Sequence, residues 1–541
     1  MFLRRQPPGY CAAFLVIGIV LLSLSALGAA NPQTPPKWMN QFNDDWELLR
    51  AGDSAAALSK FRSLWLANSG QFELAYAIGS ALDSTGHHRD ATSWYEKALK
   101  LNPRFVPAYN NLALNLASQG LFEKAVPLLK KATKLDPANE QAFYNLGLLD
   151  LQLHQASDAS SAFRQAHKLK PEETDPVVRL AYASLLAGQR SEGMKALDEY
   201  VSLSGGTPES VLEAVEILNA VGMYRDALER AHRVLPASGT DRARLTYDEA
   251  LSLFHLQQYK QASETLSHLS PSVRSKPSVS LLLGSCQALS GNLPEAVNTF
   301  QSAVRVAPGQ PEPYYRLALA LMQGSRNQDA EQVLLTGLRR IPDSPLLLYT
   351  LAMLNESETK YKDAIKYAQR SIQFAPRQPA AWMLLGDLEM RLGEYQQALH
   401  AYQTSLHYAF VAEDAIRYAD LLSSLREFSQ AKHVLESLLQ KQPTYVEAYV
   451  EFGKLYFMQK EYAQAVPFLH KALRLDPNNS DAHLFLGQIL YRLGKPDEAK
   501  QEIALAAKEK KQSEPARLLR KVLVPVTQGS LTNGGSQSAH R

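Results

Sequence analysis

Apolar residues recur along this chain at steps of three and four positions, in short stretches that glycine and proline separate. In residues 106–120, for example, one helical face would carry Tyr109, Leu112, Ala113 and Leu116. Steps of this size match the period of an α-helix. The chain shows no strand signal. The pattern therefore predicts an all-α fold built from short amphipathic helices.

A small residue returns about every 34 positions over nearly the whole chain, and it is alanine in thirteen of fourteen cases. The series is Ala57, Ala91, Ala125, Ala159, Gly193, Ala227, Ala262, Ala296, Ala330, Ala364, Ala398, Ala431, Ala465 and Ala499. Its one exception, Gly193, is smaller still. A small side chain at a fixed period marks a place where two backbones come close together. A period between about 20 and 50 residues is typical of stacked repeats.

Other positions come into register when each repeat is numbered so that this residue is position 20. Position 8 is small in Gly79, Ala113, Gly147, Gly284, Gly386, Gly453 and Gly487. Position 15 is glycine in Gly52, Gly86, Gly120, Gly188, Gly222, Gly291, Gly393 and Gly494. Position 24 is large and apolar, as in Tyr95, Leu129, Phe163, Phe300, Tyr402 and Leu469. Eight repeats close with proline at position 32: Pro103, Pro137, Pro171, Pro308, Pro342, Pro376, Pro443 and Pro477.

These positions predict a pair of antiparallel helices in every repeat. A glycine at position 15 adopts the positive φ that ends a helix. A proline at position 32 cannot continue the preceding helix. Each repeat is therefore expected to hold two helices of about three to four turns, joined by a tight bend.

The framework of the repeat can be read in three good copies. They are Phe143, Leu146, Gly147, Ala159, Phe163, Ala166 and Pro171; Trp382, Leu385, Gly386, Ala398 and Tyr402; and Tyr449, Phe452, Gly453, Tyr456, Ala465 and Pro477. This pattern resembles the tetratricopeptide repeat, in fourteen units from about Trp38 to Ser513. The resemblance implies an α-solenoid, a right-handed superhelix of antiparallel helix pairs. It also implies that the first helix of each repeat lines the concave side.

The repeats fall into three stretches, an N-terminal block over 38–173, divergent repeats over 174–276 and a C-terminal block over 277–513. The divergent repeats lack the closing proline and contain Gly193. Two interpretations remain open for them. Either structural positions have drifted neutrally, or the stretch forms a hinge or an altered groove.

The two ends stand outside the repeats. Arg4 and Arg5 precede an apolar run and a group of small residues that ends at Ala30, which predicts a secretory signal peptide over 1–30. The alternative is an uncleaved anchor, because the apolar run approaches the length that spans a bilayer. We expect an exported protein, periplasmic or secreted, or a membrane-anchored one if the segment is retained.

The remaining terminal segments have simpler expectations. Residues 31–37 read as a linker, residues 514–524 as a capping helix and residues 525–541 as a disordered tail. Cleavage of the signal would leave Cys286 as the one cysteine of the chain, and we expect it to be packed and inert.

Composition excludes several classes of function. The formal net charge is +3, which lacks the basic excess that phosphate binding requires, so nucleic acid is not the expected partner. The 13 histidines are scattered, and no phosphate-binding loop, catalytic elbow or zinc motif is present. We therefore expect no enzyme activity, no cofactor and no metal. Membrane contact is expected only if the N-terminal segment is uncleaved, and the sequence leaves the oligomeric state open.

The expected groove positions of each first helix are 2, 5, 6, 9, 12 and 13, as the resemblance implies. Asn111 and Asn145 share position 6 in neighbouring repeats and look like the start of an amide ladder that holds a peptide backbone. Tyr144 and Tyr315 at position 5 present a broad apolar face with a polar tip. The alternative is that these rings pack between helices.

Arginines at position 6 complete the candidate site. Arg179, Arg316 and Arg417 have the charge to pair with carboxylates of a partner, or else they are solvated. Together these residues predict a non-enzymatic scaffold that binds other proteins or peptides in an extracytoplasmic compartment. The second hypothesis is an accessory subunit of an envelope enzyme, transporter or assembly complex.

Overall fold

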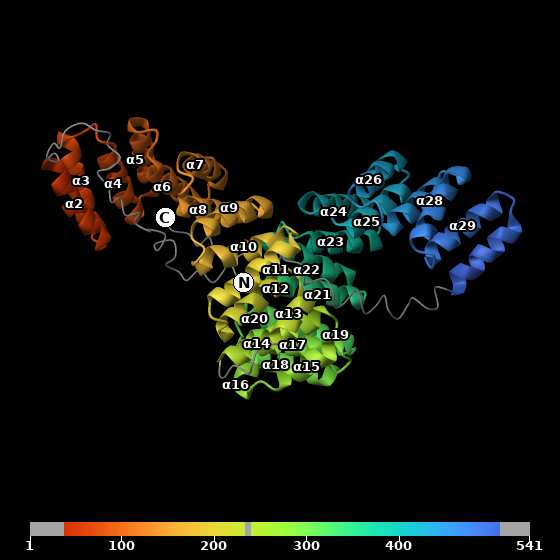
Figure 1. The fold of residues 1–541 in the computed structure, drawn as a ribbon. Coiled ribbons are helices and arrows are strands. Elements are labelled where there is room, and N and C mark those ends of the chain that lie inside the picture. Colours follow the sequence, from red (N-terminus) through yellow and green to blue (C-terminus); the bar gives the residue numbers. More distant parts are fainter. Residues whose placement is uncertain (1–36, 233–239, 509–541) are drawn as a thin grey trace. The chain divides into compact units, whose positions relative to one another are not determined.

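The computed structural model describes residues 37–232 and 240–508, and every secondary-structure element in these ranges is a helix. The fold is an all-α solenoid of stacked helices, as the pattern predicted (Figure 1). The signal segment 1–30, residues 31–36 of the linker, the capping helix 514–524 and the tail 525–541 lie outside the described residues.

The described residues form two compact bodies, which divide between Gln257 and Gln258. The N-terminal body contains α2 (Lys37–Arg50), α3 (Ser54–Ala67), α4 (Phe72–Ser84), α5 (His88–Leu101), α6 (Val106–Ser118), α7 (Phe122–Leu135), α8 (Glu140–Gln152), α9 (Ala156–Leu169), α10 (Thr174–Leu186), α11 (Arg190–Leu203), α12 (Pro208–Ala220), α13 (Tyr224–His232) and α14 (Thr240–His255).

The C-terminal body contains α15 (Tyr259–Ser267), α16 (Pro271–Arg274), α17 (Pro277–Leu289), α18 (Leu293–Val306), α19 (Pro311–Gln323), α20 (Asn327–Arg340), α21 (Pro345–Ser357), α22 (Tyr361–Phe374), α23 (Pro379–Arg391), α24 (Tyr395–Tyr408), α25 (Ala412–Ser424), α26 (Phe428–Lys441), α27 (Val446–Met458), α28 (Tyr462–Leu475) and α29 (Ser480–Arg492). Residues 496–508 are also helical.

Within each body the first helices of successive repeats contact one another. The pairs α12–α14, α19–α21, α25–α27 and α27–α29 show this most clearly. Second helices of successive repeats make no comparable contact among the described residues. First helices therefore line the inner side of each stack and second helices its outer side.

The recurrent alanine lies where the helices approach each other. All thirteen alanines of the series are at most 1% exposed, which confirms the packing prediction. At the one exception, a Cβ added to Gly193 would lie 2.5 Å from Cγ of Leu185. The Leu185 side chain occupies the space that the alanine methyl fills in other repeats.

Positions 8 and 24 of a repeat share one volume. A Cβ added to Gly79 would lie 2.8 Å from the ring of Tyr95, and one added to Gly284 would lie 2.5 Å from Phe300. Where position 8 is Ala113, position 24 is the smaller Leu129, and both are buried in one core cluster. Where position 8 is valine, position 24 is alanine, as in the buried Val215 and Ala231. In these repeats a larger side chain at one position is matched by a smaller one at the other, as close packing favours. The pair Ala352 and Ala368, both small and buried, departs from this rule.

The turn at position 15 has a positive φ in every predicted repeat. The eight predicted glycines adopt it, with φ between 76° at Gly120 and 91° at Gly52. The other six repeats place His154, Gln257, Ser325, Thr359, Arg426 and Lys460 there, also with positive φ. The glycine prediction is confirmed, and the same turn forms even where glycine is lacking.

The aromatic residue at position 4 is bonded to the proline that closes the preceding repeat. Its polar tip donates to the proline carbonyl oxygen in Tyr109 to Pro103 (3.0 Å), Tyr314 to Pro308 (3.2 Å), Trp382 to Pro376 (2.8 Å) and Tyr449 to Pro443 (2.8 Å). This bond satisfies a carbonyl that the proline turn leaves without a helical partner. It accounts for an aromatic residue with a donor at this position.

Candidate functional site

The inner face of the N-terminal body carries polar side chains that join one repeat to the next. Asn111 Nδ2 donates to the hydroxyl of Tyr76 at 2.9 Å, and Asn145 Nδ2 donates to Asn110 Oδ1 at 2.8 Å. Each bond joins position 5 of one repeat to position 6 of the next, 35 residues later. The inner face is thus fixed by a diagonal series of side-chain contacts.

Asn111 and Asn145 both lie on this diagonal, but they do not bond to each other. Asn110 stands between them, since its amide also lies 3.4 Å from Asn111 Oδ1. Asn145 is 1% exposed, and its Oδ1 accepts from Gln141 at 3.2 Å. Asn111 is half-buried. The two amides hold the repeats together in this structure, and their contact with a peptide stays a prediction.

Tyr144 and Arg179 continue the diagonal. Tyr144 is 9% exposed, and its ring meets Phe163 edge-on with centroids 5.6 Å apart. Burial raises the pKa of the Tyr144 hydroxyl, while interaction with Arg179, 35 residues later, opposes that rise. Arg179 is half-buried. The tyrosine therefore packs between helices with only its tip near the inner surface.

Tyr315 and Arg316 form a compact group on α19 in the C-terminal body. Tyr315 is 5% exposed, and the Arg316 guanidinium carbon lies 5.5 Å from the centre of its ring. Arg316 Nε also donates to Glu312 Oε1 at 2.8 Å, one turn earlier on the same helix. Arg316 thus has a carboxylate of its own chain and an aromatic face as neighbours.

Arg417 on α25 lies between two carboxylates. It donates to Asp387 on α23, and its Nη2 lies 2.8 Å from Glu413 Oε1. One repeat later, Lys454 on α27 bonds to Asp420 on α25. The inner face of this body is therefore joined by ion pairs, and a partner carboxylate would have to compete with Asp387 and Glu413 for Arg417.

Some apolar side chains at expected groove positions remain exposed. Leu186 at the end of α10 is 46% exposed, and Met390 on α23 and Met458 on α27 are each 37% exposed. All three occupy positions 12 or 13 of a first helix inside a stack. They are single exposed residues rather than one apolar patch, and each lies on the face that a segment along the first helices would cover.

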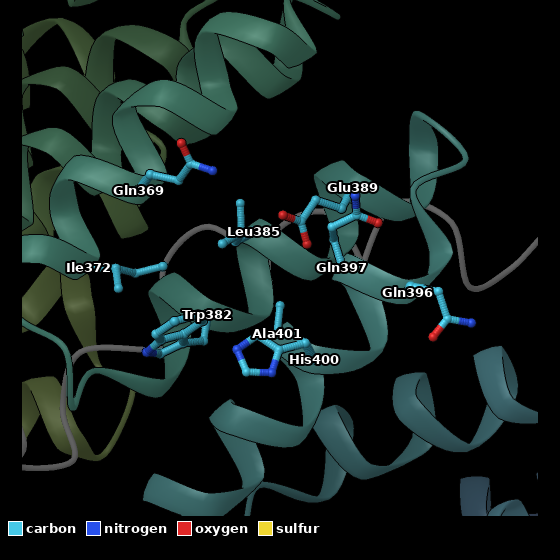
Figure 2. A pocket seen from close by; sticks show the side chains of 9 residues that line it. All are labelled: Gln369, Ile372, Trp382, Leu385, Glu389, Gln396, Gln397, His400 and Ala401. Atoms are coloured by element: carbon cyan, nitrogen blue, oxygen red, sulfur yellow. The ribbon is translucent and has the colours of Figure 1, made fainter.

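A pocket opens on the outer side of the C-terminal body, and it was not predicted from the sequence. Figure 2 shows its lining side chains on α22, α23 and α24. Its volume is about 570 Å³. Its floor is formed by the buried side chains of Ile372, Leu385 and Ala401 and the half-buried Trp382. Its rim is formed by exposed polar residues, which are Gln369, Gln396, Gln397 and His400. We call this the outer pocket.

Glu389 reaches into the outer pocket from α23 (Figure 2). It is 8% exposed, and its Oε2 receives no hydrogen bond from any described residue. Burial raises the pKa of its carboxyl to about 7, and the nearby charge of Glu394 adds to the rise. A buried carboxylate without a donor costs free energy, so this residue requires an explanation.

Other chemistry is sparse among the described residues. No group of three or more His, Cys, Asp and Glu side chains in residues 37–232 and 240–508 is arranged to hold a metal ion. Within the same ranges, no helix combines the length and the apolar character needed to cross a membrane. Cys286 is buried, and burial raises the pKa of its thiol to about 12. The thiol therefore stays protonated and inert at neutral pH.

Sequence reasoning missed Asn110 and Glu389 as members of these surfaces. The spacing of 35 residues between positions 5 and 6 would have linked Asn110 with Asn145. Glu389 would have emerged from alignment of position 11, which is leucine in most repeats.

The chain is therefore a helical-repeat solenoid in which the framework positions serve packing. Models described as "Tetratricopeptide repeat" match residues 72–105, 288–354, 349–410, 418–480 and 456–522. A model described as "TPR repeat" matches residues 115–153. The chain belongs to the tetratricopeptide-repeat family, whose helical stacks serve protein–protein interaction.

Three solved structures match this chain at low identity and with low TM-scores. Yeast Tom70 is 14% identical with a TM-score of 0.40, over 90% of this chain and 99% of that one. The APC/C hetero-tetramer Cut9-Hcn1 is 16% identical with a TM-score of 0.36, over 82% and 95%. Naa15/Naa10 bound to HypK-THB is 14% identical with a TM-score of 0.35, over 90% and 96%. A comparison with curated proteins found no matching relative. The family assignment rests on the repeat models.

Proposed function

We propose that this protein is an exported, non-catalytic scaffold that binds a segment of a partner protein along the inner face of its first helices. The proposal rests mainly on three exposed apolar side chains of the first helices. Leu186, Met390 and Met458 are large apolar residues that stay exposed at groove positions within the stacks. An extended or helical segment of a partner would bury them.

The order of the inner face supports the same proposal. In the N-terminal body, bonds such as Asn145 to Asn110 hold neighbouring first helices at a fixed spacing. In the C-terminal body, Arg417 joins α25 to α23 in a similar way. A surface that is ordered before binding loses little conformational entropy when a partner docks.

Export is supported by the N-terminal sequence, where basic residues precede an apolar run and a small-residue site. N-terminal sequencing of the protein from the exported fraction tests this proposal. A chain that begins near Ala29 or Asn31 supports cleavage. A chain that retains Met1 in the membrane fraction supports the anchor, and one that stays in the cytosol overturns export.

Site-specific photo-crosslinking tests the inner face. A benzophenone amino acid replaces Met458 or Leu186 in one set of variants, and Val306 at the end of the second helix α18 in the control. Val306 is 52% exposed, so the probe is at least as accessible there as at Leu186, which is 46% exposed. We expect discrete crosslinked partners from the inner positions only. Equal products from Val306, or none from the inner positions, would contradict groove binding.

The accessory-subunit hypothesis predicts a different pattern in the same experiment. One partner should then crosslink at both Leu186 and Met458, and it should co-purify in fixed stoichiometry with an enzyme or transporter. A scaffold should give several partners, with weaker and separable crosslinks at the two sites.

A further inference from the structure

The outer pocket arises from two residues that depart from the repeat pattern. Position 11 is leucine in most repeats, as in Leu82, Leu116, Leu218, Leu253, Leu321, Leu422 and Leu490, but it is Glu389 here. Position 23 is often large, as in Trp94, Leu128, Val333, Tyr367, Val434 and Phe468, but it is Ala401 here. The two positions face each other, since Thr299 Oγ1 at position 23 donates to Gln287 Oε1 at position 11 at 2.8 Å. Because Ala401 is small, the volume opposite Glu389 is left unfilled, and the Glu389 carboxylate borders it.

One other repeat contains the same combination and serves as an internal comparison. Asp150 at position 11 accompanies Ala162 at position 23, and Asp150 is 1% exposed. Lys130, at position 25 of the preceding second helix, favours the ionised form of Asp150 against the larger opposing effect of burial. A cation of the chain itself thus lies near the carboxylate at this second site.

The equivalent of Lys130 at the outer pocket is Gln369, which is neutral. Among the residues that line the pocket, His400 is the one basic side chain, and it lies exposed at the rim. The cation that accompanies Asp150 therefore has no counterpart near Glu389. The apolar lining of the pocket is present, since Trp382 and Leu385 form an apolar surface near the carboxyl (Figure 2).

We propose that the outer pocket binds a basic side chain, lysine or arginine, carried by a segment of a partner protein, with Glu389 as its counter-ion. The methylene stem of that side chain lies against Trp382 and Leu385, and its charged head reaches the Glu389 carboxylate. The exposed amides of Gln369, Gln396 and Gln397 line the rim, where they both donate to and accept from a peptide backbone. These amides favour a peptide over a free cation.

This pocket is separate from the inner face, so it gives the protein a second binding surface. A volume of about 570 Å³ lies within the usual range of about 300–1,000 Å³ for ligand pockets. It holds one long side chain together with part of the adjoining backbone. The proposal does not depend on inner-face binding.

Ligand-observed NMR with the full chain tests the proposal. The probes are an acetylated and amidated pentapeptide with one central lysine, and its counterparts with norleucine or glutamate in place of the lysine. We expect the lysine peptide to bind at least about 10-fold more tightly than the norleucine peptide, since a buried charge-assisted contact is worth a factor of this size. Glu389→Gln should remove that preference, and Ala401→Leu should weaken binding of both peptides by filling the space.

Two further variants separate recognition from folding. Gln369→Lys reproduces the arrangement of Lys130 and Asp150, so it should raise the melting temperature and abolish the lysine preference. Asp150→Asn is the matched control and should leave peptide binding unchanged. Equal binding of lysine and norleucine peptides, stronger binding of the glutamate peptide, no detectable binding, or a lysine preference that survives Glu389→Gln would each overturn the proposal. Crosslinking from Met458 should be unaffected by Glu389→Gln, so the two proposals fail separately.

Discussion

The two bodies share one backbone repeat, but parts of their inner faces are joined by different chemistry. Over α4, α6 and α8 of the N-terminal body the contacts are neutral, as in the bonds of Tyr76 with Asn111 and of Asn110 with Asn145. At the end of that body, ion pairs also join neighbouring first helices, where Arg244 on α14 pairs with Glu209 and Glu216 on α12. In the C-terminal body ion pairs take the same role, with Arg417 bonded to Asp387 and Lys454 to Asp420. The shared framework of alanine, glycine and proline therefore does not determine how neighbouring repeats are fastened.

The difference has consequences for what each body can recognise. Neutral amides already paired with one another respond weakly to salt and pH, whereas exposed or half-exposed ion pairs weaken as salt screens them. A partner that approaches the C-terminal body must exchange existing ion pairs for its own. The inner face of that body is therefore expected to discriminate partners by charge, and the surface over α4, α6 and α8 of the N-terminal body by shape.

Removal of Arg417 should have the largest effect. Arg417→Ala leaves Asp387, 13% exposed on its side chain, without its cation. Arg417 is partly exposed, but its removal leaves a largely buried carboxylate without a cation, so we expect a loss of about 2–4 kcal/mol in urea unfolding at low salt. Arg370→Ala on α22, where the arginine is exposed, is the control and should change little. An equal loss in both variants would mean that Arg417 contributes through general charge rather than through Asp387.

Removal of Asn145 is the corresponding change in the N-terminal body. Asn145→Ala leaves Asn110 Oδ1 and the Gln141 amide without their shared partner, and we expect a loss of about 1–3 kcal/mol. Unlike the effect of Arg417→Ala, this loss should be the same at low and high salt. Gln152→Ala is the control, since Gln152 is exposed at the end of the same helix, and it should change the stability little. A strongly salt-dependent effect of Asn145→Ala would erase the contrast between the bodies.

The pH dependence of stability should differ between two buried carboxyls, Asp150 in the N-terminal body and Glu389 in the C-terminal body. The folded-state pKa is raised above the unfolded value to about 7 at Glu389 and to about 6 at Asp150. For a raised pKa, the stabilising contribution is present at low pH and is lost as pH rises through the folded value. The contribution of Asp150 should therefore be lost before pH 7, and that of Glu389 should still be declining between pH 6.5 and 8.

Thermal melts of Glu389→Gln and Asp150→Asn against the parent chain measure this difference. The charged groups that act on these carboxyls are Glu394 at Glu389, and Lys130 and Asp158 at Asp150. His400 lines the same pocket as Glu389. We expect the advantage of Glu389→Gln over the parent to grow by about 1 kcal/mol between pH 6.5 and 8. The advantage of Asp150→Asn should stay constant over that range. Parallel curves for the two variants would refute the assignment of the raised pKa to Glu389.

Much of the framework could be predicted from the sequence because it depends on residue size and backbone freedom. Ala125 is buried and Gly120 takes a positive φ, as their spacing indicated. The contacts of the candidate site were harder to predict from the sequence. Position 6 correctly gave Asn111 and Asn145 as residues near one another, but their period could not show that Asn110 lies between them, because that depends on side-chain rotamers across two helices.

The partner of Arg417 was hidden for a different reason. Asp387 lies 30 residues before it rather than 34 or 35, since a one-residue deletion near Val411 shifts the register and the contact joins position 9 to position 6. The outer pocket needs three helices at once, α22, α23 and α24. Glu389 stands out when position 11 is aligned, but Ala401 does not, because Ala162 and Ala196 also occupy position 23. The pocket forms because the usual large apolar residues are missing at positions 11 and 23. Such a site is found only when both positions are compared over all repeats.

The turns at position 15 give the smallest expected effect, and they test whether the bodies also differ in backbone strain. The N-terminal body places glycine at five of its seven turns, whereas the C-terminal body places Ser325, Thr359, Arg426 and Lys460 at four of seven. Thr359 has φ of 59°, which is costly for a β-branched residue by about 1 kcal/mol. Thr359→Gly should therefore raise the free energy of unfolding by somewhat less than this, because glycine also gains entropy in the unfolded chain. The reverse change, Gly86→Thr in the N-terminal body, should lower it by a similar amount, as measured by urea unfolding. No stabilisation from Thr359→Gly would mean that the hydrogen bonds of this turn, such as Lys360 N to Asn355 O at 2.8 Å, fully offset the strained residue.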